Sequence, residues 1–284
     1  MRRPRKSSLR RISIHLGAAA LGATLVGSRP AAANPRPLPF SYPYETLPAE
    51  KLELEQYTDM VPMRVANEMA DGTQKGVMSI RSQLQTEFEY GITDRLEFAW
   101  YFVFRQGASA GDASMRFMGV KQRLRLRLAE EGEWPVNVGF YFEVAEFYNE
   151  IEVEEKVLLS RHFGKLNLVS NLWVEQERYF QTSESKFIYN PTVGASFEIS
   201  PNVIVGTEYW ARGRFDEPRP VDVISTSDAP VSTHHYLGPT ALVQSGEYWL
   251  SLGTYLRLDN FSSGFEVGQP YGKVWFRAVL GIGL

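Results

Sequence analysis

The sequence predicts an all-β fold, a closed antiparallel transmembrane β-barrel of about twelve strands. Three observations lead to this fold class. Long segments of the 284-residue chain alternate apolar and polar side chains, the polar positions of these segments carry many charges, and short connections alternate with longer ones. Successive side chains of a strand point to opposite faces, so each segment has one apolar and one charged face.

The stretch 77–106 shows the alternation most clearly. Its outgoing half, 77–90, places apolar side chains at Ile80, Leu84, Phe88 and Tyr90. It turns at 91–94, and the returning half carries an apolar face of Leu96, Phe98, Trp100, Phe102 and Phe104. Both halves exceed the roughly 5–6 residues usual for strands of soluble proteins. They also reach the roughly 9–11 residues that a membrane-spanning strand needs.

Residues 1–33 predict a cleaved signal peptide. The segment begins with clustered Arg and Lys residues, continues as a weakly apolar stretch over 12–26, and ends with small residues at 31–33. A short membrane anchor is the alternative, which the shortness of the apolar run disfavours. The Arg10-Arg11 pair suggests twin-arginine export, but a barrel that crosses the periplasm unfolded is better suited to the general secretory route.

Composition excludes several classes of function. Removal of 1–33 takes away seven basic residues and no acidic one, which moves the formal charge from −3 to −10 and argues against nucleic-acid binding. The chain has no cysteine, so disulfides, thiolate metal sites and cysteine nucleophiles are excluded. No apolar run after the signal approaches the roughly 18 residues of a membrane-spanning helix. A soluble β-rich periplasmic protein is a less favoured alternative.

The mature chain divides into an arm and a barrel. Residues 34–50 are rich in Pro and aromatic residues and predict a periplasmic arm, because proline lacks the donor that a strand needs. The arm either enters the barrel mouth or leads in from the periplasm. We assign 51–284 to the barrel, with strands expected at 51–59, 77–90, 95–106, 115–128, 136–147, 151–163, 166–179, 186–199, 203–214, 234–244, 248–260 and 271–284.

The connections indicate which ends face the periplasm. Short turns are expected at 91–94, 129–134, 164–165, 200–202 and 245–247, and longer loops at 60–76, 215–233 and 261–269. Short periplasmic turns and longer outer loops are typical of outer-membrane barrels, with both termini in the periplasm. The short outer connection 148–150 is the exception. Aromatic residues near the strand ends predict interfacial girdles: Tyr90, Trp134, Tyr148, Tyr179, Phe180, Tyr189, Tyr209, Tyr236, Tyr248 and Tyr271.

The charged face of the strands must point into the lumen. Lys121, Arg123, Arg125 and Arg127 occupy every second position of one strand. A lipid-facing Arg or Lys costs about 2–4 kcal/mol at mid-membrane. Further inward charges include Glu152, Glu154, Lys156, Glu177 and Arg212, and the residues expected to line the lumen are Arg81, Glu87, Glu89, Lys121, Arg123, Arg125, Arg127, Glu143, Glu175, Glu208, Arg257 and Arg277. Barrels of about eight strands are filled by side chains, and barrels of about 16–18 strands enclose a water channel. Twelve strands lie between these sizes, so the strand number does not distinguish an open bore from a plugged one.

One turn carries a family resemblance. The residues Phe88 to Glu97 read Phe-Glu-Tyr-Gly-Ile-Thr-Asp-Arg-Leu-Glu. This pattern resembles bacterial outer-membrane barrels of the channel or transporter type, including those associated with phenol-degradation pathways. The lead-in 46–48 and the start 52–55 also resemble the first strand of such proteins. The chain ends on Leu284, whereas such barrels commonly end on Phe, the residue that the assembly machinery reads.

These features predict an outer-membrane channel or porin-like transporter for small polar or anionic solutes, without enzymatic activity. The alternative is a non-conducting barrel that serves as an envelope scaffold or binds partners through the loop 215–233. The expected partners are membrane lipid, small solutes and the barrel-assembly machinery, and no cofactor or metal is expected. Ser160, His162, His234 and His235 are the residues that a hydrolase would require, and their spacing gives no support for a catalytic triad.

Overall fold

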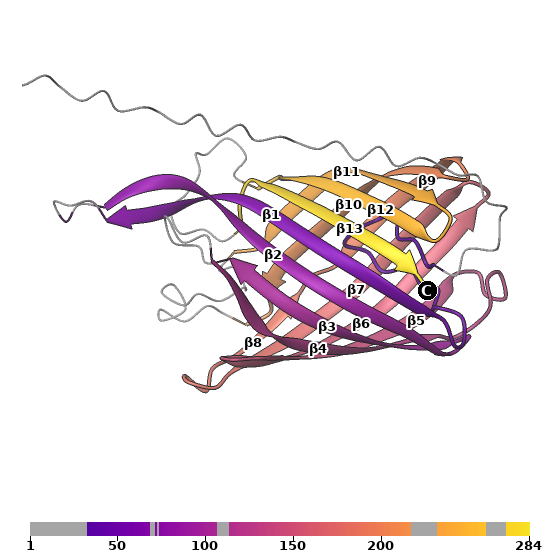
Figure 1. Cartoon of the computed structure of the whole chain (residues 1–284), viewed down its shortest axis with the longest axis horizontal. Coiled ribbons are helices and arrows are strands. Elements are labelled where there is room, and N and C mark those ends of the chain that lie inside the picture. The colour runs from indigo at the N-terminus through magenta and orange to yellow at the C-terminus, as the bar shows by residue number, and fades with distance from the viewer. Residues whose placement is uncertain (1–32, 69–71, 73, 107–113, 217–231, 260–270) are drawn as a thin grey trace, which may run out of the picture.

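The computed structural model describes residues 33–68, 72, 74–106, 114–216, 232–259 and 271–284, and the strands among them form one closed antiparallel sheet (Figure 1). The ring closes where β13 pairs with β1 and where β10 pairs with β11. The strand segments are β1 (Leu52–Glu68), β2 (Gln74–Thr93), β3 (Leu96–Gln106), β4 (Met115–Arg127), β5 (Asn137–Phe147), β6 (Glu150–Phe163), β7 (Leu166–Tyr179), β8 (Ser185–Tyr189), β9 (Thr192–Ser200), β10 (Val203–Arg214), β11 (His234–Ser245), β12 (Tyr248–Arg257) and β13 (Val274–Gly283).

The thirteen described segments occupy twelve positions around the barrel, because β8 and β9 both lie between β7 and β10. They divide what the alternation predicts as one strand over 186–199. The break falls at Asn190-Pro191, where proline has no N–H for the sheet. The predicted fold class of about twelve antiparallel strands is confirmed.

The first hairpin is longer than predicted, and the expected loop over 60–76 is wrong. β1 and β2 stay paired from Met60 opposite Ser82 to Glu68 opposite Gln74. In Figure 1 these two strands extend beyond the rest of the barrel. Pro62 and the polar residues around the turn conceal the continued alternation of this segment. The loops expected at 215–233 and 261–269 fall largely outside the described residues.

The outer face of the barrel is apolar, as predicted for a surface in contact with lipid. Phe140, Leu172 and Leu252 are 45%, 56% and 47% exposed. Trp134, Tyr148 and Tyr248 are also exposed near strand ends, in agreement with interfacial girdles. Tyr236 and Tyr271 were expected in the same girdles but are buried inside the barrel, because both lie on the inward positions of their segments. Within the described ranges, no helix is long and apolar enough to cross a membrane.

Candidate functional site

The N-terminal arm lies inside the barrel and forms the floor of the candidate site. Figure 1 shows the indigo segment before β1 within the ring of strands. The backbone N–H of Asn34 donates to Glu53 Oε2 at 2.7 Å, and that of Leu47 donates to Glu97 Oε2 at 2.6 Å. Asn34 Nδ2 also donates to the carbonyl of Glu45, which ties the two ends of the arm together. The arm therefore enters and leaves the lumen near the short turns.

The tip of the arm is held by inward side chains from the opposite wall. The backbone N–H groups of Phe40 and Ser41 donate to the Glu208 carboxylate at 3.2 and 2.6 Å. The backbone of Tyr42 exchanges two hydrogen bonds with the Asn171 amide, at 2.7 and 2.9 Å. Within the described part of the chain, residues 38–44 of the arm pair with no strand, so their buried polar groups need acceptors and donors from side chains. The barrel interior supplies them.

A buried lattice of ion pairs fills the lumen beside the lower part of the arm. Arg123 lies 3.0 Å from Glu87 and 2.8 Å from Glu89, and it also pairs with Glu97. Arg125 contacts Glu97 at 2.7 Å. Each of these side chains is at most 1% exposed. Buried charges of this kind are tolerated only when they are paired. This part of the wall is therefore structural.

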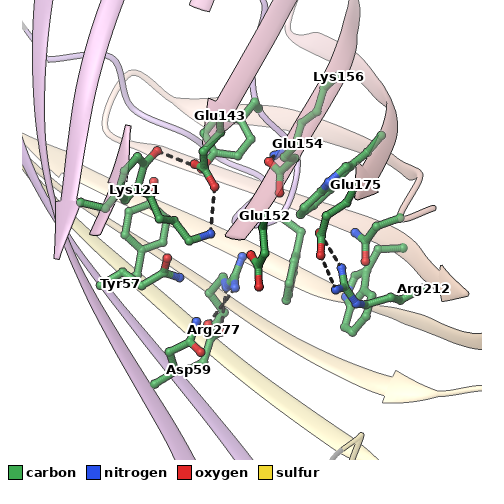
Figure 2. A pocket seen from close by; sticks show the side chains of 18 of the residues that line it. Tyr57, Asp59, Lys121, Glu143, Glu152, Glu154, Lys156, Glu175, Arg212 and Arg277 are labelled. Carbon is green, nitrogen blue, oxygen red and sulfur yellow. Dashed lines mark hydrogen bonds and ion pairs between the residues drawn. The ribbon is translucent and has the colours of Figure 1, made fainter. Parts of the chain in front are cut away.

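Above the arm tip lies a cavity of about 140 Å³. Its charged side chains form close pairs (Figure 2). Lys121 Nζ lies 2.8 Å from Glu143 Oε1, and Lys156 Nζ lies 2.7 Å from Glu154 Oε1. Two further pairs are bidentate, Arg212 with Glu175 at 3.0 and 2.8 Å and Arg277 with Asp59 at 2.7 Å. The pairs hold both signs of charge in fixed positions around the cavity.

Glu152 is the exception among these charges. It lines the cavity but makes no hydrogen bond or ion pair within the described part of the chain. Its carboxylate lies within 4.8 Å of the Glu175 and Glu177 carboxylates. Figure 2 shows it between the Lys121–Glu143 and Arg212–Glu175 pairs. It is the position on this wall where a cationic group of a solute would be attracted most strongly.

An aromatic cluster on β10, β11 and β13 lies next to Arg212 and Arg277. Trp210 stacks on Tyr236 with ring centroids 4.0 Å apart and contacts Trp275 edge-on at 5.3 Å. Phe40 from the arm stacks on Trp210 at 4.6 Å, and the guanidinium of Arg277 lies 3.7 Å above the Phe40 ring. These contacts fix the arm tip by packing as well as by hydrogen bonds. The cavity therefore combines charged pairs, an aromatic cluster and a floor made by the arm.

The residues predicted to line the lumen divide into two groups. The cavity is bordered by Arg81, Lys121, Glu143, Glu175 and Arg277. The remaining predicted residues do not border it: Glu87, Glu89, Arg123 and Arg125 belong to the buried lattice, Glu208 binds the arm, Arg257 bonds the Tyr271 carbonyl, and Arg127 bonds the Asp94 carbonyl and Glu130. Sequence reasoning missed Asp59 and the arm residues Phe40 and Tyr42. Continuing the alternation of Glu53 and Glu55 would have found Asp59.

The two neighbouring histidines at the outer rim have structural partners. His234 Nδ1 lies 2.7 Å from Asp259 Oδ2, and the backbone N–H of His235 donates to Asp259 Oδ1 at 2.8 Å. His235 Nδ1 contacts the Tyr209 hydroxyl at 2.7 Å. Burial alone would raise the pKa of Asp259, but the hydrogen bonds from His235 and His234 outweigh it and hold that pKa below its ordinary value. These contacts fasten the end of β12 to the start of β11.

Neither a protein-family model nor a curated protein matches the sequence. Solved structures do match. An outer membrane channel from Pseudomonas putida F1 superposes with a TM-score of 0.59 and 13% identity over 85% of this chain and 98% of that chain. The NanC porin superposes with a TM-score of 0.50 and 7% identity over 82% of this chain and 98% of that chain. The chain thus has the fold of outer-membrane channel barrels.

Proposed function

We propose that this chain is an outer-membrane channel for small polar or anionic solutes, with no enzymatic activity, in which the N-terminal arm forms the constriction. The observation that carries the proposal is the charge-lined cavity inside a closed barrel, open above and bounded below by the arm. The apolar outer surface and the fold shared with channel proteins support the membrane location. We further propose that the barrel-assembly machinery inserts it.

The balance of charge around the cavity supports polar or anionic solutes. Cations and carboxylates lie side by side around the bore, as in the Lys121–Glu143 and Arg277–Asp59 pairs, and these fixed dipoles attract polar molecules. The cations slightly outnumber the carboxylates, with Arg81, Arg105, Lys121, Lys156, Arg212 and Arg277 against Asp59, Glu143, Glu152, Glu154 and Glu175. The excess of one cation favours anions, and Glu152, which has no ion-pair partner among the described residues, is the acidic exception.

The arm limits passage because its tip borders the cavity. Phe40 and Tyr42 line the cavity from below, and Ser41 between them is bonded to the barrel wall. A solute that leaves the cavity toward the periplasm must pass these side chains. We propose that displacement of the arm tip opens the path, with Glu208 as its main anchor.

A reversible disulfide tests this role of the arm. Ser41 Oγ and Thr192 Oγ1 are 2.7 Å apart, so the double variant Ser41→Cys/Thr192→Cys joins the arm tip to β9. The chain has no other cysteine with which the pair can react. We expect single-channel conductance in a planar bilayer to fall when the variant is oxidised and to recover after reduction. The single variant Ser41→Cys is the matched control and should not respond to oxidant.

The outcomes distinguish the channel from the alternative. The buried lattice around Arg123 favours a non-conducting scaffold, since it fills the lumen beside the arm. Inserted protein that stays silent in both redox states would support that scaffold and contradict the channel. Equal conductance in both states would retain the channel but refute the arm as its constriction.

A further inference from the structure

A groove crosses the outer, membrane-facing surface of the barrel, on the side away from the lumen cavity. It spans β6, β7, β9, β10 and β11 and has a volume of about 440 Å³. Its outward-facing lining is mostly apolar and consists of Val136, Leu159, Leu168, Ser170, Val193, Ala195, Thr207, Tyr209 and Leu237, with Arg161 at one end. The groove is therefore a depression in the apolar belt and not part of the charged lumen.

The register of the strands explains the groove. Leu168 lies opposite Ala195, and Ala195 lies opposite Thr207, so small side chains occupy adjacent positions on β9 and β10. Ser170 adds a third small residue on β7. Larger side chains stand around this floor, with Leu168, Val193 and Leu237 at 41%, 52% and 43% exposure. A long apolar chain can lie along such a floor with contacts on both sides.

One end of the groove carries a cation. Arg161 lines the groove three residues before the turn at Gly164, which places it at the periplasmic end of β6. Its Nη1 donates to the Trp134 carbonyl at 3.2 Å, and its guanidinium lies 5.9 Å from the Phe163 ring centroid. No carboxylate of the described residues forms an ion pair with Arg161. Arginine beside exposed aromatic residues is typical of the depth where lipid headgroups lie.

We propose that this groove is a binding site for an anionic phospholipid of the periplasmic leaflet. The phosphate is held by the Arg161 guanidinium, which retains several N–H donors beyond the one used by Trp134. One acyl chain lies in the groove over Ser170 and Ala195. Charge complementarity at one end and an apolar floor along the rest match the two parts of such a lipid. This site is independent of whether the lumen conducts.

The test measures lipid retention by the full mature protein. Native mass spectrometry of the detergent-extracted barrel, titrated separately with phosphatidylglycerol and phosphatidylcholine of identical acyl chains, gives the occupancy of each lipid. We expect Arg161→Gln to lower phosphatidylglycerol occupancy about fivefold, the factor that one cation near the membrane surface contributes. We expect Ala195→Leu, which fills the floor, to lower the occupancy of both lipids.

Two matched controls separate the groove from the general surface. Arg95→Gln removes an exposed arginine near another short turn, and Ala278→Leu enlarges an outward residue of β13; neither position lines the groove. Both should retain wild-type occupancy. Equal occupancy by the two lipids in the wild type, or unchanged occupancy in both groove variants, would overturn the proposal. A dimer that carries no lipid and is dissociated by Ala195→Leu would also overturn the proposal, because the groove would then be a contact between two copies of the chain.

Discussion

Replacement of Arg123 by methionine tests whether the buried lattice stabilises the barrel or serves conduction. The Arg123 side chain is fully buried, and a single Nη2 atom lies 3.0 Å from Glu87, 2.8 Å from Glu89 and in contact with Glu97. Methionine keeps much of the volume but removes the charge. Three carboxylates then share a site in which Arg125 is the nearest remaining cation, at 2.7 Å from Glu97.

The expected loss of stability is large. Removing one partner of a buried ion pair costs about 3–5 kcal/mol, because the remaining charge is left buried and uncompensated. We expect Arg123→Met to reach the upper part of this range, since three carboxylates lose their shared cation at once. Lys121→Met is the matched control. It loses one partner, Glu143, and its side chain is 16% exposed beside the cavity, so its cost should be clearly smaller.

Urea unfolding of the refolded barrel measures this difference, followed by tryptophan fluorescence and by the mobility of the folded band on unheated gels. A second substitution, Glu87→Gln, in the Arg123→Met background should recover part of the lost free energy of unfolding, because Arg123 is the cation that pairs with Glu87 among the described residues. If Arg123→Met and Lys121→Met lowered stability equally, or if Arg123→Met altered ion selectivity without lowering stability, the lattice would not be the structural element described above.

Two further predictions concern the cavity and the outer rim. Glu152→Gln should shift the reversal potential in a salt gradient toward anion selectivity, because it removes the unpaired carboxylate of the cavity; Glu155→Gln, on the exposed side of the same strand, should leave the potential unchanged. The pKa of Asp259 in the folded protein lies below its ordinary 3.8. The Asp259 carboxylate therefore stabilises the fold above pH 3.8, and this contribution is lost as the pH falls through the lowered pKa. The difference in free energy of unfolding between wild type and Asp259→Asn should therefore vanish in acid, and a difference that persisted there would refute the Asp259 anchor.

Strand positions follow from the sequence because a lipid-facing strand must keep strict alternation over many residues. Phe140, Phe142 and Leu172 had to be apolar outside, and Lys121 and Arg123 had to be inside, so the parity of each strand was determined without any tertiary information. The same constraint fails beyond the membrane. Past Met60 the alternate positions are Pro62 and Arg64, so the sequence suggests a loop although Val61, Met63 and Val65 continue the buried face.

The split of one strand and the position of the arm needed the structure. Pro191 ends β8 because proline lacks an N–H for the sheet. Proline is also common at the start of a strand, so the sequence alone does not show whether the strand is divided there. In the structure β7 pairs with both β8 and β9, on either side of the break. The proline-rich sequence of the arm predicts an extended segment but does not indicate where that segment lies. Its place in the lumen depends on individual hydrogen bonds from distant strands, such as those that Glu208 and Asn171 make with the backbone at 40–42.

The composition of the lattice makes the arm part of the barrel interior and not an addition to it. The lower wall carries more carboxylates than Arg123 and Arg125 can compensate, and Arg36 of the arm supplies a further cation by pairing with Glu55 at 2.5 Å. Deletion of the arm would leave Glu55 buried beside Glu87 without this cation. A loss of conductance after deletion of the arm would then have two explanations, a misassembled barrel and the loss of the constriction. A disulfide at position 41 fixes the arm and leaves every charge in place. A change in conductance on forming this disulfide therefore reports the position of the arm and not a loss of charge pairing.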